Sequence, residues 1–290
     1  MRLALLADIH GNLPALEAVL KALKSDTPDG ILVAGDWIAG PWSNETLDRM
    51  SDHLPTSILG NTDIRLFDLV DGKAPGNWSV LKQFALARWD AEHLDENYLR
   101  LLRSLPEQRI IHPEGTAAIL LVHGSMESPF KGLSNERHPE RIERTFEQLE
   151  QSVLVCGHTH CPMIISRKGK TIVNPGAVSG PLNGDVRAQY ALLDWHDDHW
   201  QVELKGTEYD KTRLIKGFED SGLLREGGAL ARCFLETELT GEDISLLFFE
   251  HIDAIAESRD VELDSFVPDD IWEEAEDTFD WQAVEQRRQL

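Results

Sequence analysis

Five short segments of the chain combine aspartate, asparagine and histidine residues, and each follows a run of apolar residues that is typical of a buried strand. The segments are Asp8-Ile9-His10, Gly35-Asp36, Gly60-Asn61-Thr62-Asp63, His123-Gly124 and Gly157-His158-Thr159-His160. Carboxylate, amide and imidazole groups are ligands that divalent transition metals accept in proteins. Because each segment stands where a strand would end, these side chains can meet at the edge of a sheet. The series therefore predicts a site for two cations about 3.5–4 Å apart, an arrangement suited to phosphoryl chemistry.

Each segment taken singly has an ordinary explanation. An isolated aspartate is more often a turn or helix cap, and an isolated histidine is more often a structural group. Asp8 and His10 point the same way if the chain stays extended, because side chains alternate along a strand. His158 and His160 share a face by the same argument, and Asp36 can lie between two ions and bridge them. Five such segments in series favour the metal site over the separate explanations.

Asn61 and His123 complete a candidate set of seven metal ligands. The amide oxygen of Asn61 suits a hard cation, although Gly60-Asn61 is also strong turn chemistry. His123 follows a strand-like run and precedes a glycine, so its ring can project from the end of a strand into a cleft.

Runs rich in Leu, Ile and Val predict the strands that would position these segments. They cover residues 2–7, 30–34, 57–60, 118–122 and 153–156. A helix predicted over 13–23 joins the first two strands into a βαβ unit. Two hairpins are predicted at 163–167 with 170–174 and at 188–195 with 199–205.

Helical spacing also appears between these strands. A helix is predicted over 43–53, with Ser43 or Asn44 as its N-cap. Helices over 78–91 and 95–104, the second capped by Asp95, predict a helical insertion at about 65–108.

Composition limits the function classes. The chain has 290 residues and a net charge of −23, which argues against general nucleic-acid binding. No stretch approaches the ~20 apolar residues of a membrane span, and Asp8 ends the N-terminal apolar run too early for a signal peptide. The three cysteines lack the spacing of a zinc site and predict free thiols in a reducing compartment. We therefore expect a cytoplasmic protein that does not bind membranes.

The acidic residues concentrate at the C-terminus. Residues 211–290 carry 8 Lys and Arg residues but 21 Asp and Glu residues, and this shift predicts a separate helical extension over 209–290 after a main domain over 1–208. An apolar stripe from Ile244 to Ile255 predicts a packing face, either internal or in a homo-oligomer. The stretch 264–290 is either a docked arm or a flexible tail. We expect the extension to lie outside the metal site.

The five segments together resemble those of the calcineurin-like metallophosphoesterase superfamily, and its small bacterial and archaeal phosphodiesterase-like branch is most similar. Residues 174–179, Asn-Pro-Gly-Ala-Val-Ser, resemble a segment that follows the last histidines in that branch, and 89–106 resembles its helical insertion. The resemblance covers about 1–206 and leaves the acidic extension uncovered.

The resemblance implies an α/β (α+β) fold, a four-layer αββα sandwich of two mixed β-sheets flanked by helices. It also implies two divalent metal ions per chain. One ion takes Asp8, His10, Asp36 and His160, and the other takes Asp36, Asn61, His123 and His158. Asp36 would bridge the ions. The mixed nitrogen and oxygen donors favour Mn²⁺, with Fe, Ni²⁺, Zn²⁺ and Mg²⁺ as alternatives.

The mechanism implied by the resemblance is attack on phosphorus by a hydroxide that bridges the two metals, without a protein nucleophile. The residues assigned to catalysis are Asp36, Asn61, Thr62, Asp63 and His123. Many relatives carry a histidine where this chain has Thr62, steadied by the acid at position 63. A threonine hydroxyl is a very poor proton donor, so the substitution favours activated phosphodiesters. We expect Thr62 to matter little for metal binding.

Substrate contacts are less defined. Asn61, Arg65 and Asn12 are candidate substrate-binding residues, and Ser125 and His138 are further candidates. Gly40, Gly72 and Gly76 are best explained as loop glycines.

The leading hypothesis is a metal-dependent phosphohydrolase, most simply a phosphodiesterase acting on a small organic phosphate or nucleotide. Within enzymes, the alternative is a phosphomonoesterase or dinucleoside polyphosphatase. The alternative of another class is a non-catalytic metal-binding scaffold, which Thr62 and the acidic extension suggest and the complete ligand set opposes.

Overall fold

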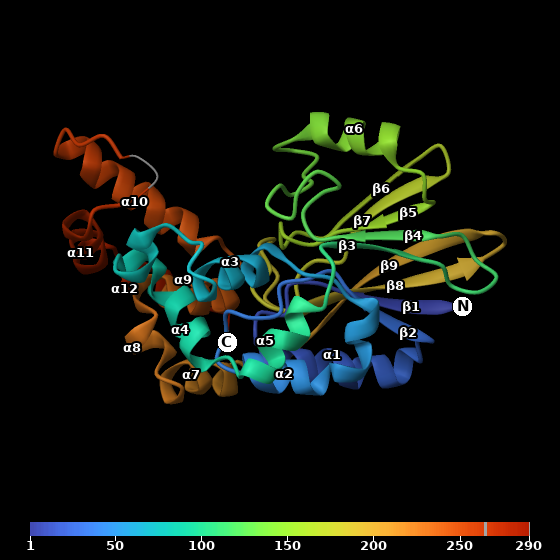
Figure 1. Cartoon of the computed structure of the whole chain (residues 1–290), viewed down its shortest axis with the longest axis horizontal. Helices are drawn as coiled ribbons and strands as arrows, with labels where there is room; N and C mark the ends of the chain where they lie inside the picture. The colour runs from blue at the N-terminus through green and yellow to red at the C-terminus, as the bar shows by residue number, and fades with distance from the viewer. Residues whose placement is uncertain (264–265, 290) are drawn as a thin grey trace.

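The computed structural model describes residues 1–263 and 266–289 and shows four layers (Figure 1). Helices α1 and α2 cover one sheet, a second sheet packs on the first, and α6 covers the far side. The strands are β1 (Arg2–Leu6), β2 (Gly30–Val33), β3 (Gln108–Ile111), β4 (Ile119–Val122), β5 (Val153–Val155), β6 (Met163–Arg167), β7 (Lys170–Asn174), β8 (Ala188–His196) and β9 (His199–Thr207). Their order is β2-β1-β8-β9 in one sheet and β3-β4-β5-β7-β6 in the other, and both sheets mix parallel and antiparallel pairs. The expected αββα sandwich is confirmed.

The first strand illustrates why the strands are continuous apolar runs. In β1, Leu3 and Leu5 face the second sheet, whereas Ala4 and Leu6 pack toward α1. Each of these side chains is buried. A strand buried on both faces has apolar residues on both sides, and this explains the continuous apolar run in the sequence.

The helices account for the remaining regular structure. They are α1 (Leu13–Asp26), α2 (Ser43–Arg49), α3 (Asn61–Val70), α4 (Ala85–His93), α5 (Glu96–Arg103), α6 (Pro139–Gln148), α7 (Lys211–Asp220), α8 (Leu223–Glu226), α9 (Gly228–Thr240), α10 (Ile244–Ser258), α11 (Asp269–Thr278) and α12 (Trp281–Glu285). Three 3₁₀ turns occupy Ser51–Thr56, Gly76–Ser79 and Lys82–Phe84. The predicted helix over 13–23 and both predicted hairpins are confirmed.

Two local predictions are wrong. Neither Ser43 nor Asn44 is an N-cap, because their side chains donate to the carbonyl oxygens of Gly40 and His93 and both residues lie inside α2. The predicted strand at 57–60 is an extended segment outside both sheets. Its residues are apolar because the segment is buried beside β2, and burial alone cannot distinguish a strand from a buried loop.

The helical insertion and the C-terminal extension pack against each other to form a lobe beside the sandwich (Figure 1). Leu86 and Trp89 of the insertion share an apolar cluster with Leu214, Phe218 and Leu239 of the extension. The extension is therefore docked on the main domain rather than tethered to it.

The apolar stripe on α10 is internal. Ile244, Phe248 and Ile252 are fully buried in a cluster with Trp272 and other residues of the last two helices. Within the stretch 264–290, positions 264, 265 and 290 lie outside the described residues, and the remainder is docked through α11 and α12. No helix in the described part of the chain is long and apolar enough to cross a membrane.

Candidate metal centre

The loops that follow the strands carry an unusual backbone conformation. Asp8, His10, Asp36, His158 and His160 all have positive φ, between 45° and 68°. Residues with a Cβ rarely adopt this region, and such conformations persist where surrounding structure imposes them. Here the amides of residues 9 and 10 both donate to the carbonyl oxygen of Asp36. The expectation that Asp8 and His10 lie together is confirmed, but the assumed extended chain is wrong.

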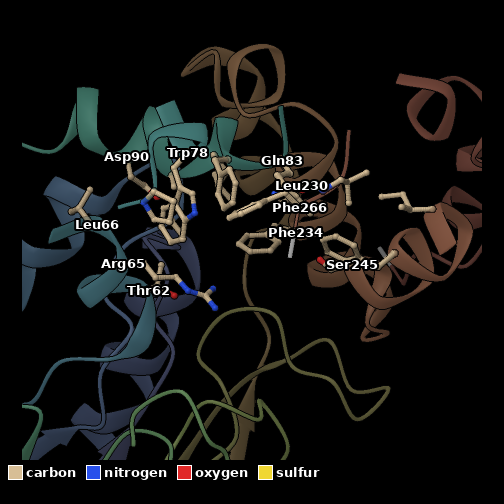
Figure 2. A pocket seen from close by; sticks show the side chains of 18 of the residues that line it. Thr62, Arg65, Leu66, Trp78, Gln83, Asp90, Leu230, Phe234, Ser245 and Phe266 are labelled. Atoms are coloured by element: carbon tan, nitrogen blue, oxygen red, sulfur yellow. Dashed lines mark hydrogen bonds between the residues drawn. The ribbon is translucent and has the colours of Figure 1, made fainter. Parts of the chain in front are cut away.

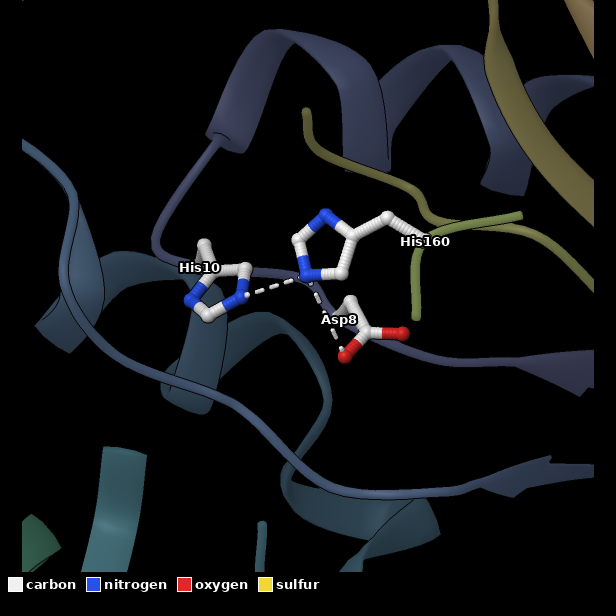
Figure 3. A group of neighbouring side chains, drawn as sticks. All are labelled: Asp8, His10 and His160. Carbon is white, nitrogen blue, oxygen red and sulfur yellow. Dashed lines mark hydrogen bonds and ion pairs between the residues drawn. The ribbon is translucent and has the colours of Figure 1, made fainter. Parts of the chain in front are cut away.

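One cluster of donors joins Asp8, His10 and His160 (Figure 3). The Nε2 atoms of the two histidines are 3.3 Å apart, and His160 Nε2 is 3.5 Å from Asp8 Oδ1. The Nδ1 atoms of His10 and His160 contact the carbonyl oxygens of Ile38 and Gly180 at 2.8 and 2.7 Å. A carbonyl oxygen only accepts, so each Nδ1 carries a proton, and the Nε2 atoms of the two rings face the same point. Two facing imidazole nitrogens beside a carboxylate could hold a cation.

A second cluster joins Asn61, His123 and His158. Asn61 Oδ1 lies 2.9 Å from His123 Nε2 and 2.6 Å from His158 Nδ1. His123 Nδ1 contacts the carbonyl oxygen of Ala34 at 2.7 Å, which again leaves Nε2 directed inward.

Asp36 lies between the two clusters. Its Oδ2 atom is 3.5 Å from His10 Nε2 and 3.4 Å from His123 Nε2. Asp8 also reaches both sides, because its Oδ1 is 4.0 Å from His123 Nε2. The structure thus brings all seven sequence-predicted ligands together around the two aspartates.

Neighbouring carboxylates and imidazoles in the site shift one another's pKa values. Burial opposes ionisation of Asp36, but His123, His10 and a hydrogen bond from Thr62 outweigh burial and hold the pKa of Asp36 well below its usual range. Burial likewise opposes the charged form of His123, but Asp36 and Asp8 raise its pKa to about 9. Burial and the neighbouring charge of His123 lower the pKa of His158 to about 4. The site combines buried carboxylates with imidazoles and favours bound positive charge.

Thr62 and Asp63 make their hydrogen bonds to different parts of the site. The backbone N and Oγ1 of Thr62 donate to the two carboxylate oxygens of Asp36, at 2.9 and 3.0 Å. Asp63 is fully buried and accepts from the amides of Gly60, Asp36 and Trp37. Asp63 therefore ties two ligand-bearing loops together and does not steady the side chain at position 62.

Glycines make the close approach of these loops possible. A Cβ on Gly60 would lie 2.0 Å from Asp36 Oδ1, and a Cβ on Gly40 would lie 2.0 Å from the carbonyl oxygen of His10. Gly40 is thus a packing residue of the site, which the sequence analysis missed. Gly72 and Gly76 have open space around them, as expected for loop glycines.

A cavity of about 410 Å³ opens from the ligands and is partly walled by the C-terminal extension. Phe234, Glu238 and Ser245 line this cavity beside His10 and His160. The extension supplies none of the seven predicted metal ligands, but it walls the cavity that opens from them. Phe234 and Glu238 sit on a helix whose sequence gave no motif, so only the fold places them there.

Some of the candidate substrate contacts line the cavity and others lie away from it. Arg65 lines the cavity. Asn12 also borders it, but its Oδ1 caps α1 and its Nδ2 donates to Glu238 Oε1. Ser125 is engaged in a buried turn, and His138 lies on the surface beside Glu140. Arg65 and Asn12 thus border the cavity, Asn12 also links the main domain to the extension, and Ser125 and His138 lie outside the cavity.

Comparison with known proteins identifies the class. Residues 1–198 match the model of the calcineurin-like phosphoesterase superfamily domain. Two curated relatives are each 26% identical: MJ0912 of Methanocaldococcus jannaschii, over 72% of this chain and 88% of that protein, and phosphodiesterase YfcE of Escherichia coli, over 67% and 88%. The chain belongs to the calcineurin-like phosphoesterase superfamily.

Solved structures agree. A metallophosphoesterase from Sphaerobacter thermophilus is 27% identical, with a TM-score of 0.62 over 79% of this chain and 100% of that one. The protein PH1004 of Pyrococcus horikoshii has a TM-score of 0.67 at 22% identity, covering 83% and 98%, and so shares the fold. The chain is therefore a hydrolase of phosphoester bonds, from a metal-dependent family.

Proposed function

We propose that this enzyme is a phosphodiesterase that acts on a small organic phosphate or nucleotide phosphoester and uses two divalent metal ions per chain. The observation that carries the proposal is the position of Asp36, whose Oδ2 lies between His10 Nε2 and His123 Nε2 at 3.5 and 3.4 Å. One ion would be held by Asp8, His10, Asp36 and His160, and the other by Asp36, Asn61, His123 and His158.

The donor set fits such ions. The inward-facing Nε2 atoms of His10, His160 and His123, together with oxygens of Asp8 and Asp36, suit Mn²⁺ or another transition metal better than Ca²⁺. Fe, Ni²⁺, Zn²⁺ and Mg²⁺ remain alternatives. When bound, such ions supply hydroxide near neutral pH and neutralise charge on the phosphoryl group.

The chain's own residues set which ester is cleaved. The guanidinium group of Arg65 lines the cavity and can bind phosphate oxygens with paired hydrogen bonds. The Thr62 hydroxyl donates to Asp36 and is a poor acid, so it supplies no proton to a leaving oxygen. An ester whose leaving oxygen departs without a proton is therefore favoured, and this supports an activated diester over an alkyl monoester.

The test is hydrolysis of bis-p-nitrophenyl phosphate and p-nitrophenyl phosphate with each candidate metal. We expect turnover of the diester with Mn²⁺, loss of turnover in His10→Ala, and full turnover in the control His138→Ala, whose side chain lies on the surface. Preference for the monoester would favour the phosphomonoesterase alternative. A purified protein that turns over no phosphoester with any of these metals would favour the scaffold.

A cytoplasmic location is also proposed. The three cysteines are free thiols, as expected in a reducing compartment. Assembly through the C-terminal helices and the absence of general nucleic-acid binding stay predictions from the sequence.

A further inference from the structure

A second and larger cavity adjoins the metal centre. It has a volume of about 890 Å³ and lies between the helical insertion and the C-terminal extension. We name it the aromatic pocket, after the rings of Trp78, Phe84, Phe234 and Phe249 that line it. Its size falls in the range of pockets that hold drug-sized ligands or cofactors.

The aromatic pocket is continuous with the cavity at the metal ligands. Ala39, Thr62, Arg65, Phe234 and Ser245 line both spaces. Figure 2 shows Thr62 and Arg65 on one side of the pocket, below the rings of Trp78 and Phe234. A phosphoester whose phosphate lies at Arg65 would therefore extend its organic group among these rings.

The walls suit a planar group. Trp78 and Phe84 are stacked, with ring centroids 4.5 Å apart and planes inclined by 15°. Such a surface offers a flat apolar face, and stacking on aromatic side chains is a common means of holding nucleobases.

One buried acid makes the pocket more than an apolar cleft. Asp90 lines it, is 4% exposed, and has a carboxylate oxygen, Oδ1, with no hydrogen-bond partner among the described residues. Burial raises the pKa of this carboxyl well above its ordinary value. An unpartnered buried polar atom is costly and uncommon, and a ligand with a ring nitrogen or amino group would satisfy it.

We propose that the aromatic pocket binds a planar heteroaromatic group of the substrate, such as a nucleobase, stacked on Trp78 and Phe84 and hydrogen-bonded to Asp90. The inference rests on the proposed function and names the substrate class: a phosphoester with a heteroaromatic organic group. An alkyl chain would match the rings but would leave Asp90 Oδ1 without a partner.

The test is binding of adenosine, ribose and n-octanol to the full-length protein as purified, measured by calorimetry and saturation-transfer NMR. None of these probes contains a phosphoester, so binding is read without turnover. We expect adenosine to bind with a Kd of about 1 mM or tighter, and ribose to show no binding at tenfold higher concentration.

Variants locate the binding. Trp78→Ala should weaken adenosine binding about 5- to 150-fold, as expected for loss of one stacked base contact. The matched control is Val80→Ala, because Val80 follows the same 3₁₀ turn but is 68% exposed. It should leave binding unchanged. Asp90→Leu should weaken adenosine binding about 2- to 12-fold without weakening n-octanol binding, and it provides an independent result if Trp78→Ala does not fold.

Three results would overturn the inference: no binding of adenosine, n-octanol binding tighter than adenosine, or adenosine binding that neither Trp78→Ala nor Asp90→Leu changes. Its failure is separable from failure of the proposed function. An enzyme that cleaves bis-p-nitrophenyl phosphate but does not bind adenosine refutes only the pocket assignment. A protein that binds adenosine but cleaves no phosphoester with any metal refutes only the proposed function.

Discussion

Replacing Thr62 by valine tests whether its hydroxyl holds the carboxylate that lies between the two donor clusters. Valine has nearly the shape of threonine, so the substitution removes the hydrogen bond from Oγ1 to Asp36 Oδ2, 3.0 Å long, and keeps the backbone bond to Oδ1. The sequence alone predicts little effect on metal binding. The structure predicts a clear loss.

The magnitude follows from the charge of the acceptor. A hydrogen bond to a charged group contributes about 1.5–3 kcal/mol, which corresponds to about 10- to 150-fold in an equilibrium constant. Changing a group that orients a metal ligand typically costs about 10–100-fold in affinity. Because the backbone bond of residue 62 survives, we expect a loss near the lower end, about tenfold.

The assay is a competition titration of Mn²⁺ against a chelator, with metal content measured in parallel. Thr62→Ser keeps the hydroxyl and serves as the matched control, for which we expect affinity within about twofold of the native protein. Equal affinities in the valine and serine variants would show that this hydrogen bond does not hold Asp36 for metal binding.

Three further predictions address the loops and the sheet edge. Gly60→Ala should greatly reduce both metal binding and turnover, because its Cβ would lie 2.0 Å from Asp36 Oδ1; unchanged metal content would contradict this. Asp36→Asn should abolish turnover in a chain whose circular dichroism and melting temperature stay near native, since only charge is removed; native turnover would remove the two-metal proposal. Asp26 accepts from Lys205 and Tyr190. Although burial acts in the opposite direction, these partners lower the pKa of Asp26 below its ordinary value of 3.8. Asp26→Asn should therefore lower the free energy of unfolding by about 1–3 kcal/mol at pH 7, and the difference should shrink as pH falls below about 3.8 and through the lower folded pKa. Urea unfolding at pH 7 and pH 3 measures this, and a pH-independent difference would refute it.

The sequence predicts those parts of the fold in which burial determines the type of residue. Strands β1 and β4 are buried on both faces and are therefore uninterrupted apolar runs. The hairpin of β6 and β7 turns at Gly169, which has positive φ. The segment 57–60 has the same apolar signature but lacks a ladder, because burial and strand pairing are separate properties.

The candidate metal ligands could be predicted from their residue types alone, without knowledge of the backbone conformation. Asp8 and His160 adopt left-handed backbone conformations, which could not be predicted from their residue types. The role of Asp63 was hidden for another reason. Its carboxylate accepts from backbone amides, including those of Asp36 and Trp37. Because nearly every residue carries a backbone amide, the sequence does not indicate which amides a carboxylate will bind.

The contribution of the C-terminal extension could not be predicted because it depends on docking between distant segments. Glu238 accepts from Asn12 Nδ2, from the Ser179 hydroxyl and from Tyr209. It thereby ties the extension to the helix after the first ligand loop and to the loop after β7. Because the extension contains many acidic residues, the sequence does not indicate that Glu238 forms this link.

This arrangement divides the two tasks of the enzyme between two parts of the chain. The loops of the sandwich, with Asn61 at the start of α3, supply every predicted metal ligand, and their positions are fixed by glycines, by Asp63 and by carbonyl oxygens that hold the imidazoles. The aromatic pocket is built instead from the insertion and the extension, which meet through their own apolar cluster. Arg65 begins the insertion and lines both cavities. Change in the lobe can therefore alter which organic group is accepted while the ligands stay in place, which is why the five segments reveal the chemistry and not the substrate.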